Sequence, residues 1–558
     1  MIAFAAACDA VAATPAKSLK IERLSAYFRS LDPPDLAAAA RFTAGKPLGA
    51  ADDRKLAIGG RTILAAARRA WNVDDVALSA GYRETGDLGE ALGPLLREPA
   101  TPSLFTETLT PAAFAAILDE IASASGPSAG KKREHACERI LRACRTEREA
   151  VYAIKILTGD LRIGLREGLV LDAIAAAFAR EPAAVRRAAM AAGDVGAVAL
   201  AARTGTLEAI EVRYGAPVGF MLASPVAFGS DYRELSEGAW LVENKYDGIR
   251  AQAHKQGDAV KLYSRTFSEI SRAFPEVVTA LRAQRGDFIL DGEIVARRDG
   301  AVLPFRYLQP RLQRVDPSAE LQAEIPVTFV AFDLLANGKT FLIDEPLVER
   351  RALLAEALTS APALETAQWQ SLEPGADPSV VARLFDEARA LGNEGLVFKR
   401  TDAPYAPGRR GKWWLKLKRE LSTLDCVVVA VEWGHGKRAK VLSDYTFAVR
   451  RSADDGELLP IGKAYTGLTD AEIAEMTQWF LAHRIGSGER RTIVVEPSIV
   501  VEIAFDIIQK SDLHASGFAL RFPRIARLRP DKPAGEADTM ADVERIYAEM
   551  LEREGVAR

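Results

Sequence analysis

The chain has 558 residues, of which 48% are hydrophobic and 27% are charged, and its formal net charge is −3. Its length allows roughly three domains of ~150 to 200 residues each, and its composition is ordinary for a globular protein. The balanced charge neither supports nor excludes a nucleic-acid partner, because basic residues can cluster on one surface. The four cysteines form no C-x-x-C pair, which argues against a zinc finger or a disulfide framework and fits a reducing cytoplasm.

No stretch of the sequence predicts secretion or membrane insertion. The N-terminal residues are apolar, but they lack a basic segment and Asp9 interrupts them, so they predict a helix rather than a signal peptide. No apolar run reaches the ~18 residues of a membrane span. We therefore expect a cytoplasmic protein with no membrane partner.

Residues 1–212 are expected to form a mostly helical domain. Alanine, the strongest helix former, is abundant, as in residues 172–179. Apolar residues recur at spacings of three and four, as they do on one face of a helix. Basic residues between 131 and 148 are interspersed with glutamates, which is typical of a solvated helix face.

The stretch 159–166, Gly-Asp-Leu-Arg-Ile-Gly-Leu-Arg, is distinctive within this region. Its glycines let backbone amides approach phosphates closely, and Arg162 and Arg166 supply charge without sequence specificity. A helix corner with surface arginines is the alternative interpretation. The composition changes near residue 215, where glycine and proline indicate a linker into a strand-rich region.

The stretch with the clearest chemistry is 241–250, Leu-Val-Glu-Asn-Lys-Tyr-Asp-Gly-Ile-Arg. Its apolar start predicts a partly buried strand, in which Glu243 and Lys245 face the same side. Burial and cationic neighbours lower the pKa of a lysine from about 10.4 and free its amine as a nucleophile. The stretch resembles the K-x-D-G-x-R signature of the covalent nucleotidyltransferases, which implies that Lys245 forms a phosphoramide with AMP or GMP. A surface strand that ends in a turn is the alternative.

Short apolar strands alternate with helices over residues 238–420, and several stretches resemble other motifs of this superfamily. The match at Arg265 implies a contact with the nucleotide phosphate. Glu293 lies in an apolar run, where a carboxylate is costly unless it is paired, protonated or bound. Its D-G-E match implies a contact with the ribose or magnesium, and a structural ion pair is the alternative. Phe332 resembles a ring that stacks on adenine, and Glu394 resembles a ligand of Mg²⁺, which prefers oxygen.

The basic segment 408–419 closes this region. Its second half alternates, so that its leucines face one side while Lys416 and Lys418 face the other. Two such lysines would neutralise a triphosphate and, through like charge, lower the pKa of a lysine nucleophile. The segment resembles the W-L-K-x-K motif, which implies phosphate contacts for both lysines and a nucleotide contact for Arg410. A basic strand that faces solvent is the alternative.

From residue 421 onwards short β segments and glycine-containing turns dominate. This pattern predicts a small barrel such as an OB-fold, which is a common platform for nucleic acids. Near the end of the chain, Arg529-Pro-Asp531-Lys532 resembles an R-x-D-K motif. The resemblance implies that this motif orients the β and γ phosphates of the nucleotide.

Together these motifs resemble, in their order, those of ATP-dependent DNA ligases of the three-domain type, and the stretch 159–166 resembles an element of their helical domain. The resemblance implies a multidomain fold: an all-α DNA-binding domain over 1–212, an α/β (α+β) adenylation domain over 216–420 and an all-β OB-fold domain over 421–558. It implies an enzyme that uses ATP and Mg²⁺, forms Lys245-AMP and seals nicks in double-stranded DNA between the 3′-hydroxyl and the 5′-phosphate. It further implies a monomer that encircles DNA during repair, replication or recombination.

The same resemblance implies the residues of the site. They are Lys245 as the catalytic nucleophile; Glu243, Lys245, Arg250, Arg265, Glu293, Phe332, Arg410, Lys416, Lys418, Arg529, Asp531 and Lys532 for the nucleotide; Glu293 and Glu394 for the metal; and Arg162 and Arg166 for DNA.

Four alternatives stay open. A capping enzyme would use GTP and would have no reason to contain the stretch 159–166. An RNA ligase shares the catalytic core, and only a comparison of nicked substrates separates it. An NAD-dependent DNA ligase normally has a four-cysteine zinc module, which the scattered cysteines cannot form. A catalytically inactive DNA clamp is opposed by the presence of Lys245, Glu293, Glu394 and Lys416, but only activity excludes it.

Overall fold

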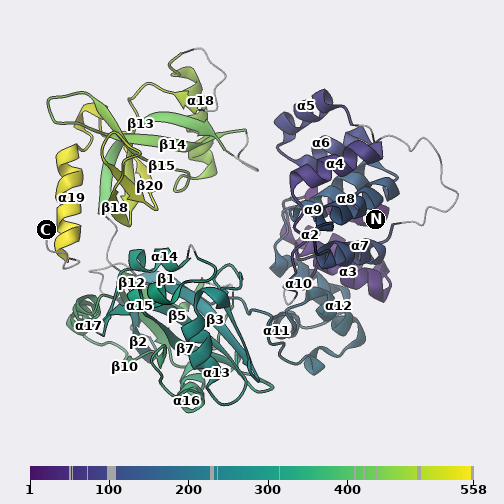
Figure 1. Cartoon of the computed structure of the whole chain (residues 1–558), viewed down its shortest axis with the longest axis horizontal. Coiled ribbons are helices and arrows are strands. Elements are labelled where there is room, and N and C mark those ends of the chain that lie inside the picture. Colours follow the sequence, from purple (N-terminus) through teal and green to yellow (C-terminus); the bar gives the residue numbers. More distant parts are fainter. Residues whose placement is uncertain are drawn as a thin grey trace. The chain divides into compact units, whose positions relative to one another are not determined.

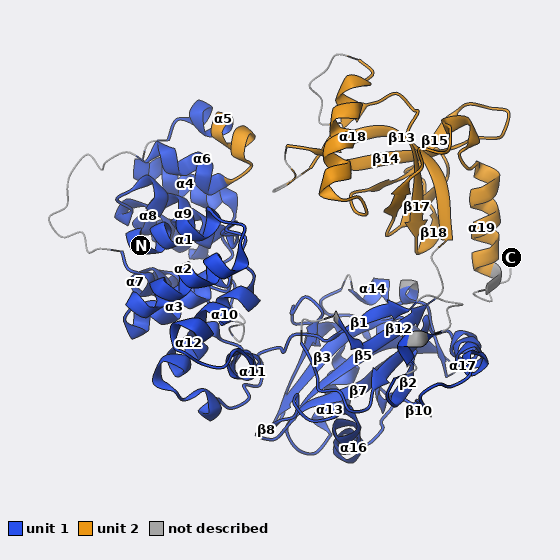
Figure 2. Cartoon of the chain, turned by 180° about the vertical axis from the view of Figure 1, so that it is seen from behind, with its two compact units in different colours: residues 1–79, 88–419 blue, residues 80–87, 420–558 orange. Residues whose placement is uncertain are grey.

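The computed structural model begins with a helical region, which is followed by two regions built around β-sheets (Figure 1). It forms two compact units, residues 1–79 with 88–419 and residues 80–87 with 420–558 (Figure 2). The structure describes residues 1–49, 52, 54–71, 73–96, 109–226, 232–235, 237–298, 300–312, 314–407, 410–418, 422–434, 438, 440–486 and 492–553, except the side chains of Arg233, Arg306, Arg410, Glu552 and Arg553.

The N-terminal region is helical throughout its described elements, as the sequence predicts. Its helices pack around one apolar core that contains Phe4, Phe28, Phe42 and Phe114. The helices are α1 (Ile2–Ala12), α2 (Lys17–Ser30), α3 (Pro33–Thr43), α4 (Gly60–Trp71), α5 (Asp75–Thr85), α6 (Leu88–Leu92), α7 (Pro111–Ser123), α8 (Ala129–Ala143), α9 (Glu147–Thr158), α10 (Glu167–Ala177), α11 (Pro182–Ala192) and α12 (Val195–Thr204).

Local sequence signals set the ends of several of these helices. Asp32, Thr110 and Thr146 each accept a hydrogen bond from a backbone N–H in the first turn of the helix that follows. Gly159 ends α9 with a φ of 78°, a left-handed conformation that glycine adopts without strain. The turn 159–166 therefore begins at a fixed point of the helical region.

The four cysteines are all buried and form no disulfide. Removal from water raises the pKa of each thiol, because burial disfavours the thiolate. Among the described residues, no helix is both long and apolar enough to cross a membrane.

The middle region contains two sheets with helices packed on them. One sheet has the order β1-β12-β11-β2-β10, and the other has the order β4-β3-β5-β7-β8, with β6 beside β5 and β9 beside β7. The elements are β1 (Leu222–Val226), β2 (Trp240–Lys245), β3 (Ile249–Gln256), β4 (Ala259–Ser264), α13 (Pro275–Arg282), β5 (Phe288–Arg298), β6 (Ala301–Val302), α14 (Gln309–Leu312), α15 (Ala319–Glu324), β7 (Val327–Asn337), β8 (Thr340–Phe341), α16 (Leu347–Ala357), β9 (Leu364–Thr366), β10 (Trp369–Leu372), α17 (Pro378–Ala390), β11 (Gly395–Arg400) and β12 (Arg410–Lys418).

The register of the first sheet aligns the motifs across three strands. Glu243 of β2 pairs with Val397 of β11, which pairs in turn with Lys416 of β12. Directly opposite residues in antiparallel strands point to the same face of a sheet. Glu243 and Lys416 therefore share a face, and the alternation along each strand places Lys245 and Lys418 on that face too.

The C-terminal region is an antiparallel β domain, whose described residues include two α-helices. Its main sheet has the order β15-β14-β13-β17-β20, with β16 beside β13, and β18 and β19 form a separate hairpin. The elements are β13 (Ser422–Trp433), β14 (Leu442–Arg450), β15 (Leu458–Ala464), α18 (Asp470–Ala482), β16 (Thr492–Val494), β17 (Val500–Phe505), β18 (Ile507–Lys510), β19 (Phe518–Arg521), β20 (Arg524–Leu528) and α19 (Met540–Arg553). A helical region, an α+β region and a β region follow each other in the predicted order. The boundaries after residues 212 and 420 stay predictions.

The turn between β2 and β3 passes very close to β5. A Cβ atom at Gly248 would lie 2.3 Å from the backbone oxygen of Ile294 and 3.0 Å from the Cγ of Glu293. No side chain fits there without a shift of the backbone, which explains the glycine of the K-x-D-G-x-R stretch in physical terms.

We predict that Gly248→Ala destabilises the protein by about 1 to 3 kcal/mol, the usual cost of inserting a methyl group into a packed site. Chemical denaturation followed by fluorescence would measure the change. Gly411→Ala is the matched control, because a Cβ on that β12 residue meets open space. Equal midpoints for the two variants would contradict the close approach of the turn to β5.

Candidate active site

A hollow of about 200 Å³ is lined by strands of both sheets of the middle region. The first sheet contributes residues from β1, β2, β11 and β12, and the second contributes residues from β3, β5 and β7. The predicted nucleotide residues that line it are Glu243, Lys245, Arg250, Arg265, Glu293, Phe332 and Lys416. The fold therefore gathers residues that are up to 173 positions apart in the chain, from Glu243 to Lys416.

Lys245 is the last residue of β2, and its amine forms an ion pair with Glu394. The Nζ atom lies 2.7 Å from the Oε2 atom of Glu394, and both side chains are partly exposed. The N–H of Glu394 also donates to the backbone oxygen of Lys245 over 2.7 Å, so the two residues are joined through main chain and side chain. The sequence predicted cationic neighbours for this amine; Lys416 lines the same hollow, and the ion-pair partner of Lys245 is a carboxylate. Lys245 must therefore leave this contact before it can act as a nucleophile.

Two further carboxylates lie near this pair. Burial raises the pKa of Glu293 to about 8, and the charges of Lys245 and Arg250 oppose that rise. Burial also raises the pKa of Asp247 to about 6, although the N–H of Phe305 donates to its Oδ2 atom over 2.9 Å. The repulsion of Glu394 contributes to both shifts.

This acidic end fits a magnesium ion that is shared with a ligand. Mg²⁺ keeps several waters and is usually held by one or two carboxylates together with phosphate oxygens. Glu293 and Glu394 could supply the carboxylates, and Asp247 is a third nearby acid that sequence reasoning did not assign. Within the described ranges, no group of three or more His, Cys, Asp or Glu residues forms a metal site by itself.

The opposite end of the hollow contains a buried ion pair beside an aromatic ring. Lys399 Nζ lies 2.6 Å from Glu243 Oε2, and Arg351 Nη1 lies 3.5 Å from Glu243 Oε1. The ammonium of Lys399 also sits 4.1 Å from the ring centre of Phe332. Burial lowers the pKa of Lys399, and the charge of Glu243 opposes this effect.

Two atoms of this ion pair lack hydrogen bonds. Within the described part of the chain, Glu243 Oε1 and Lys399 Nζ are buried without a hydrogen bond of good geometry. Such orphaned groups are costly unless a ligand satisfies them. The sequence analysis gave Lys399 no role, and a lysine directly after the apolar run 396–398 was the available signal.

Arg250 is held in one orientation by its surroundings. Its Nε and Nη2 atoms donate to the two carboxylate oxygens of Asp291 over 3.0 and 2.6 Å, and its Nη1 atom donates to Met221 O over 2.7 Å. The rings of Phe332 and Trp414 lie 5.3 and 5.4 Å from its Cζ atom. These contacts hold the guanidinium of Arg250 in one orientation, in which it lines the hollow.

The residues of the basic strand that were predicted to contact phosphate differ in their position relative to the hollow. Lys416 lines the hollow, whereas Lys418, two residues further along β12, does not. Lys418 pairs with Gly395, the cross-strand partner of Lys245, so it still lies on the face of the sheet that bears the nucleophile. The side chain of Arg410 lies outside the described part of the structure.

The R-x-D-K motif lies in the second compact unit, after β20. Arg529 and Lys532 both form ion pairs with the carboxylate of Asp425, and Arg529 also pairs with Asp531. The guanidinium of Arg529 holds the pKa of Asp531 down at about 2. Together with Asp425, the motif thus forms a cluster of two cations and two carboxylates within the second compact unit.

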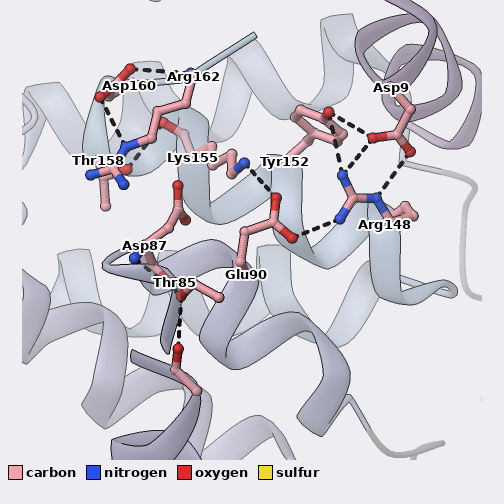
Figure 3. A network of polar contacts seen from close by, with 11 residues as sticks. Asp9, Thr85, Asp87, Glu90, Arg148, Tyr152, Lys155, Thr158, Asp160 and Arg162 are labelled. Carbon is pink, nitrogen blue, oxygen red and sulfur yellow. Dashed lines mark hydrogen bonds and ion pairs between the residues drawn. The ribbon is translucent and has the colours of Figure 1, made fainter. Parts of the chain in front are cut away.

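The turn 159–166 is firmly anchored in the helical region. Helix α9, which precedes it, takes part in a network in which Arg148 binds Asp9 and Glu90, and Lys155 binds Glu90 (Figure 3). The buried ammonium of Lys20 also donates to the backbone oxygens of Ile163 and Gly164 in the turn, over 2.7 and 3.2 Å.

The two predicted DNA residues of this turn differ in their contacts. Arg162 has a φ of 52° and donates to the carboxylate of Asp160 through its backbone and its guanidinium. Arg166 is exposed and precedes the first residue of α10. The structure therefore places one arginine against an acid and the other towards solvent.

A strand-end lysine, with carboxylates on one side and an aromatic ring and a buried ion pair on the other, forms a candidate nucleotide site of the kind expected for a covalent nucleotidyltransferase. Comparison with known proteins specifies the family. The model of the DNA ligase N terminus matches residues 1–175, that of the ATP dependent DNA ligase domain matches 220–418, and that of the ATP dependent DNA ligase C terminal region matches 438–532.

Individual proteins agree with these matches. The chain is 45% identical to a protein named "Probable DNA ligase" of Koribacter versatilis (strain Ellin345), over 97% of this chain and 95% of the relative. It is 35% identical to a DNA ligase of Archaeoglobus fulgidus, over 94% of each chain. A solved structure named Pmar-Lig_Pre, at 17% identity, shares the fold with a TM-score of 0.56 over 94% of this chain and 99% of that chain.

The chain belongs to the ATP-dependent DNA ligase family. The predicted family, the predicted class of enzyme and the predicted order of a helical, an adenylation and a β domain are thereby confirmed. As is general in this family, the enzyme uses ATP to seal breaks in DNA. The roles of individual residues stay predictions.

We predict that Glu293 makes the stability of the nucleotide-free protein depend on pH. A carboxyl group with a raised folded-state pKa costs stability as pH rises from its unfolded-state pKa to its folded-state pKa. For Glu293 this window runs from about pH 4.5 to about pH 8. The melting temperature of Glu293→Gln should therefore fall less across this window than that of the unmodified protein.

Differential scanning fluorimetry across the window would measure the effect. Glu373→Gln, a change at an exposed carboxylate of the same region, is the control and should follow the unmodified protein. Parallel curves for Glu293→Gln and the unmodified protein would contradict the raised pKa.

Proposed function

We propose that Lys245 is the residue of this ligase that becomes covalently attached to AMP. The observation that carries this proposal is the position of its amine, at the end of β2 in a hollow that also contains Arg250, Glu293 and Phe332. A nucleotide bound there would have its base at the Phe332 end and its phosphates at the Lys245 end.

The proposed reaction follows from this arrangement. The deprotonated Nζ atom of Lys245 attacks the α-phosphorus of ATP, a P–N bond forms, and the bond to pyrophosphate breaks. AMP then passes to the 5′-phosphate of a nick, and the 3′-hydroxyl displaces AMP to form the phosphodiester bond. A magnesium ion held by Glu293 and Glu394 would supply charge neutralisation for the phosphates. The chain itself contributes mainly position and positive charge, as is usual in phosphoryl transfer.

The orphaned pair Glu243–Lys399 supports adenine as the base. The Watson–Crick edge of adenine offers an amino donor beside a ring-nitrogen acceptor, which matches the acceptor Glu243 Oε1 and the ammonium of Lys399, neither of which has a well-placed hydrogen bond among the described residues. Guanine offers an acceptor and donors in the reverse order. Phe332 would stack on the base, since its ring lines the same hollow.

The proposed phosphate contacts come from both compact units. Arg265 and Lys416 line the hollow, and Lys418 and Arg410 belong to the strand that contains Lys416. Arg529, Asp531 and Lys532 would orient the β and γ phosphates during adenylation, a role that rests on the R-x-D-K resemblance.

The substrate and setting of the reaction complete the proposal. We propose nicked double-stranded DNA as the substrate, with Arg162 and Arg166 contacting its phosphates, because a ligase must accept any sequence. We also propose a cytoplasmic monomer that closes round DNA during repair, replication and recombination, with domains over 1–212, 216–420 and 421–558. The family membership supports this setting, since each of these processes leaves nicks.

Labelling of the denatured protein tests the nucleophile. Incubation with Mg²⁺ and α-labelled ATP, GTP or NAD should give label from ATP alone, and Lys245→Ala should abolish it. Lys339→Ala is the matched control, because that lysine is 84% exposed and forms a surface ion pair with Glu211. Both variants should keep the melting temperature of the unmodified protein.

The outcomes of this experiment discriminate between the alternatives. Label that persists in Lys245→Ala would refute the nucleophile, and label from GTP would indicate capping chemistry. If ATP labels Lys245 as expected, the sealing of nicked DNA and nicked RNA duplexes should be compared. Preference for the RNA nick would overturn the proposed substrate.

We predict that Phe332→Leu raises the KM for ATP in adenylation by roughly tenfold, within the range expected for the loss of base stacking. The maximal rate of adenylation should change much less, because the substitution leaves the phosphate end of the hollow intact. Phe341→Leu is the control, since Phe341 packs in the same apolar cluster but does not line the hollow. An unchanged KM for Phe332→Leu would remove the stacking role.

A further inference from the structure

Asp425 forms the centre of the charged cluster in the second compact unit. This residue belongs to β13, and its carboxylate is bound by two cations that lie more than 100 positions later in the chain. Arg529 Nη1 donates to Oδ1 and Oδ2 over 2.9 and 2.8 Å, and Lys532 Nζ donates to Oδ2 over 2.7 Å. The two cations are thus brought together on a single carboxylate.

The guanidinium of Arg529 is fixed on both of its edges. Asp425 binds its Nη1 atom, and Asp531 accepts from its Nε and Nη2 atoms over 3.0 and 2.9 Å. The side chains of Asp425, Arg529 and Lys532 are only 12%, 18% and 21% exposed, so water screens the contacts with Asp425 weakly. A single rotamer of Arg529 is therefore strongly favoured.

The backbone of Asp425 is also held in place. Its N–H donates to the carboxylate of Asp538 over 2.8 Å, and its backbone oxygen accepts from the N–H of Asp538 over 2.9 Å. In the sheet Asp425 pairs with Glu502 of β17. The N–H of Arg529 donates to the backbone oxygen of Val500, which belongs to the same strand β17. The backbones of Asp425 and Arg529 are therefore both hydrogen-bonded to the main sheet of this unit.

We propose that Asp425 is a positioning residue for adenylation, which holds Arg529 and Lys532 side by side so that both can bind one phosphate group of ATP. This inference rests on the proposed role of the R-x-D-K motif. A carboxylate resembles a phosphoryl group in offering paired oxygen acceptors to Arg and Lys. Two cations that already share one carboxylate are therefore spaced to share one phosphate.

The benefit of such positioning lies in the rate rather than in the affinity. Preorganised cations need no rearrangement when charge develops on the leaving pyrophosphate, so they lower the barrier. Removal of the negative charge of Asp425 leaves the cations more attractive to ATP but free to adopt other rotamers. The variant should therefore adenylate more slowly without a higher KM for ATP.

The test is single-turnover adenylation of the full chain, freed of bound AMP, with α-labelled ATP and Mg²⁺. Asp425→Asn should reduce the maximal rate about tenfold, within the range for misplaced catalytic groups, and should leave the KM for ATP equal or lower. Asp425→Glu, which retains the carboxylate, should recover part of the rate. Sealing of a nick that already carries AMP should proceed at the normal rate, because no triphosphate takes part in that step.

Glu502→Gln is the matched control. Glu502 is the cross-strand neighbour of Asp425 and pairs with Arg527, which is not part of the R-x-D-K motif. This variant should adenylate and seal like the unmodified protein.

Three results would overturn the inference. They are an unchanged adenylation rate in Asp425→Asn, a faster rate, and an equal loss of adenylation and sealing accompanied by a lower melting temperature. Arg529→Ala and Lys532→Ala separate this inference from the function on which it rests. If Arg529→Ala and Lys532→Ala both adenylate at the normal rate, the proposed role of the motif itself is wrong. If both variants adenylate slowly while Asp425→Asn adenylates at the normal rate, only the role of Asp425 is wrong.

Discussion

The pairing of β2 with β11 and of β11 with β12 is the constraint on which the candidate active site depends. It places Glu243, Lys245 and Lys416 on one face of a sheet, because opposite residues in antiparallel strands point the same way. A slip of one residue in either pairing would turn part of this set to the other face. The glycine turn after Lys245 then brings β3 and β5 of the second sheet close enough to contribute Arg250 and Glu293.

Charge is distributed unevenly along the hollow. At one end the amine of Lys245 lies among carboxylates, and at the other a carboxylate, Glu243, lies between Lys399 and Arg351. At each end the burial of a charged group is energetically unfavourable, as the raised pKa of Glu293 and the lowered pKa of Lys399 indicate. An adenine nucleotide with a divalent cation would relieve both ends, since it offers complementary groups at its base and at its phosphates. Functional sites commonly retain such unsatisfied charge at the expense of the stability of the free protein.

The sequence predicted the fold class and half of the residues that line the hollow, because strand alternation and short motifs act over a few residues. It predicted less well what depends on contacts between distant segments. The Glu394 partner of Lys245 was assigned to metal alone, and the ion pair of Lys399 with Glu243 was missed, since 156 positions separate its members. Asp425 was missed for the same reason, as nothing in Leu-Asp-Cys-Val marks it as the partner of Arg529. Alternation also suggested equal roles for Lys416 and Lys418, whereas only Lys416 lines the hollow.

The burial of all four cysteines has a practical consequence for experiments on this enzyme. Thiol reagents react with the thiolate, and these thiols are both inaccessible and difficult to ionise. A single cysteine introduced on the surface of each compact unit would therefore be the site that a maleimide dye modifies in the native chain. Pairs of dyes attached in this way would measure the distance between the two units at each step of adenylation and sealing, without prior removal of the native cysteines.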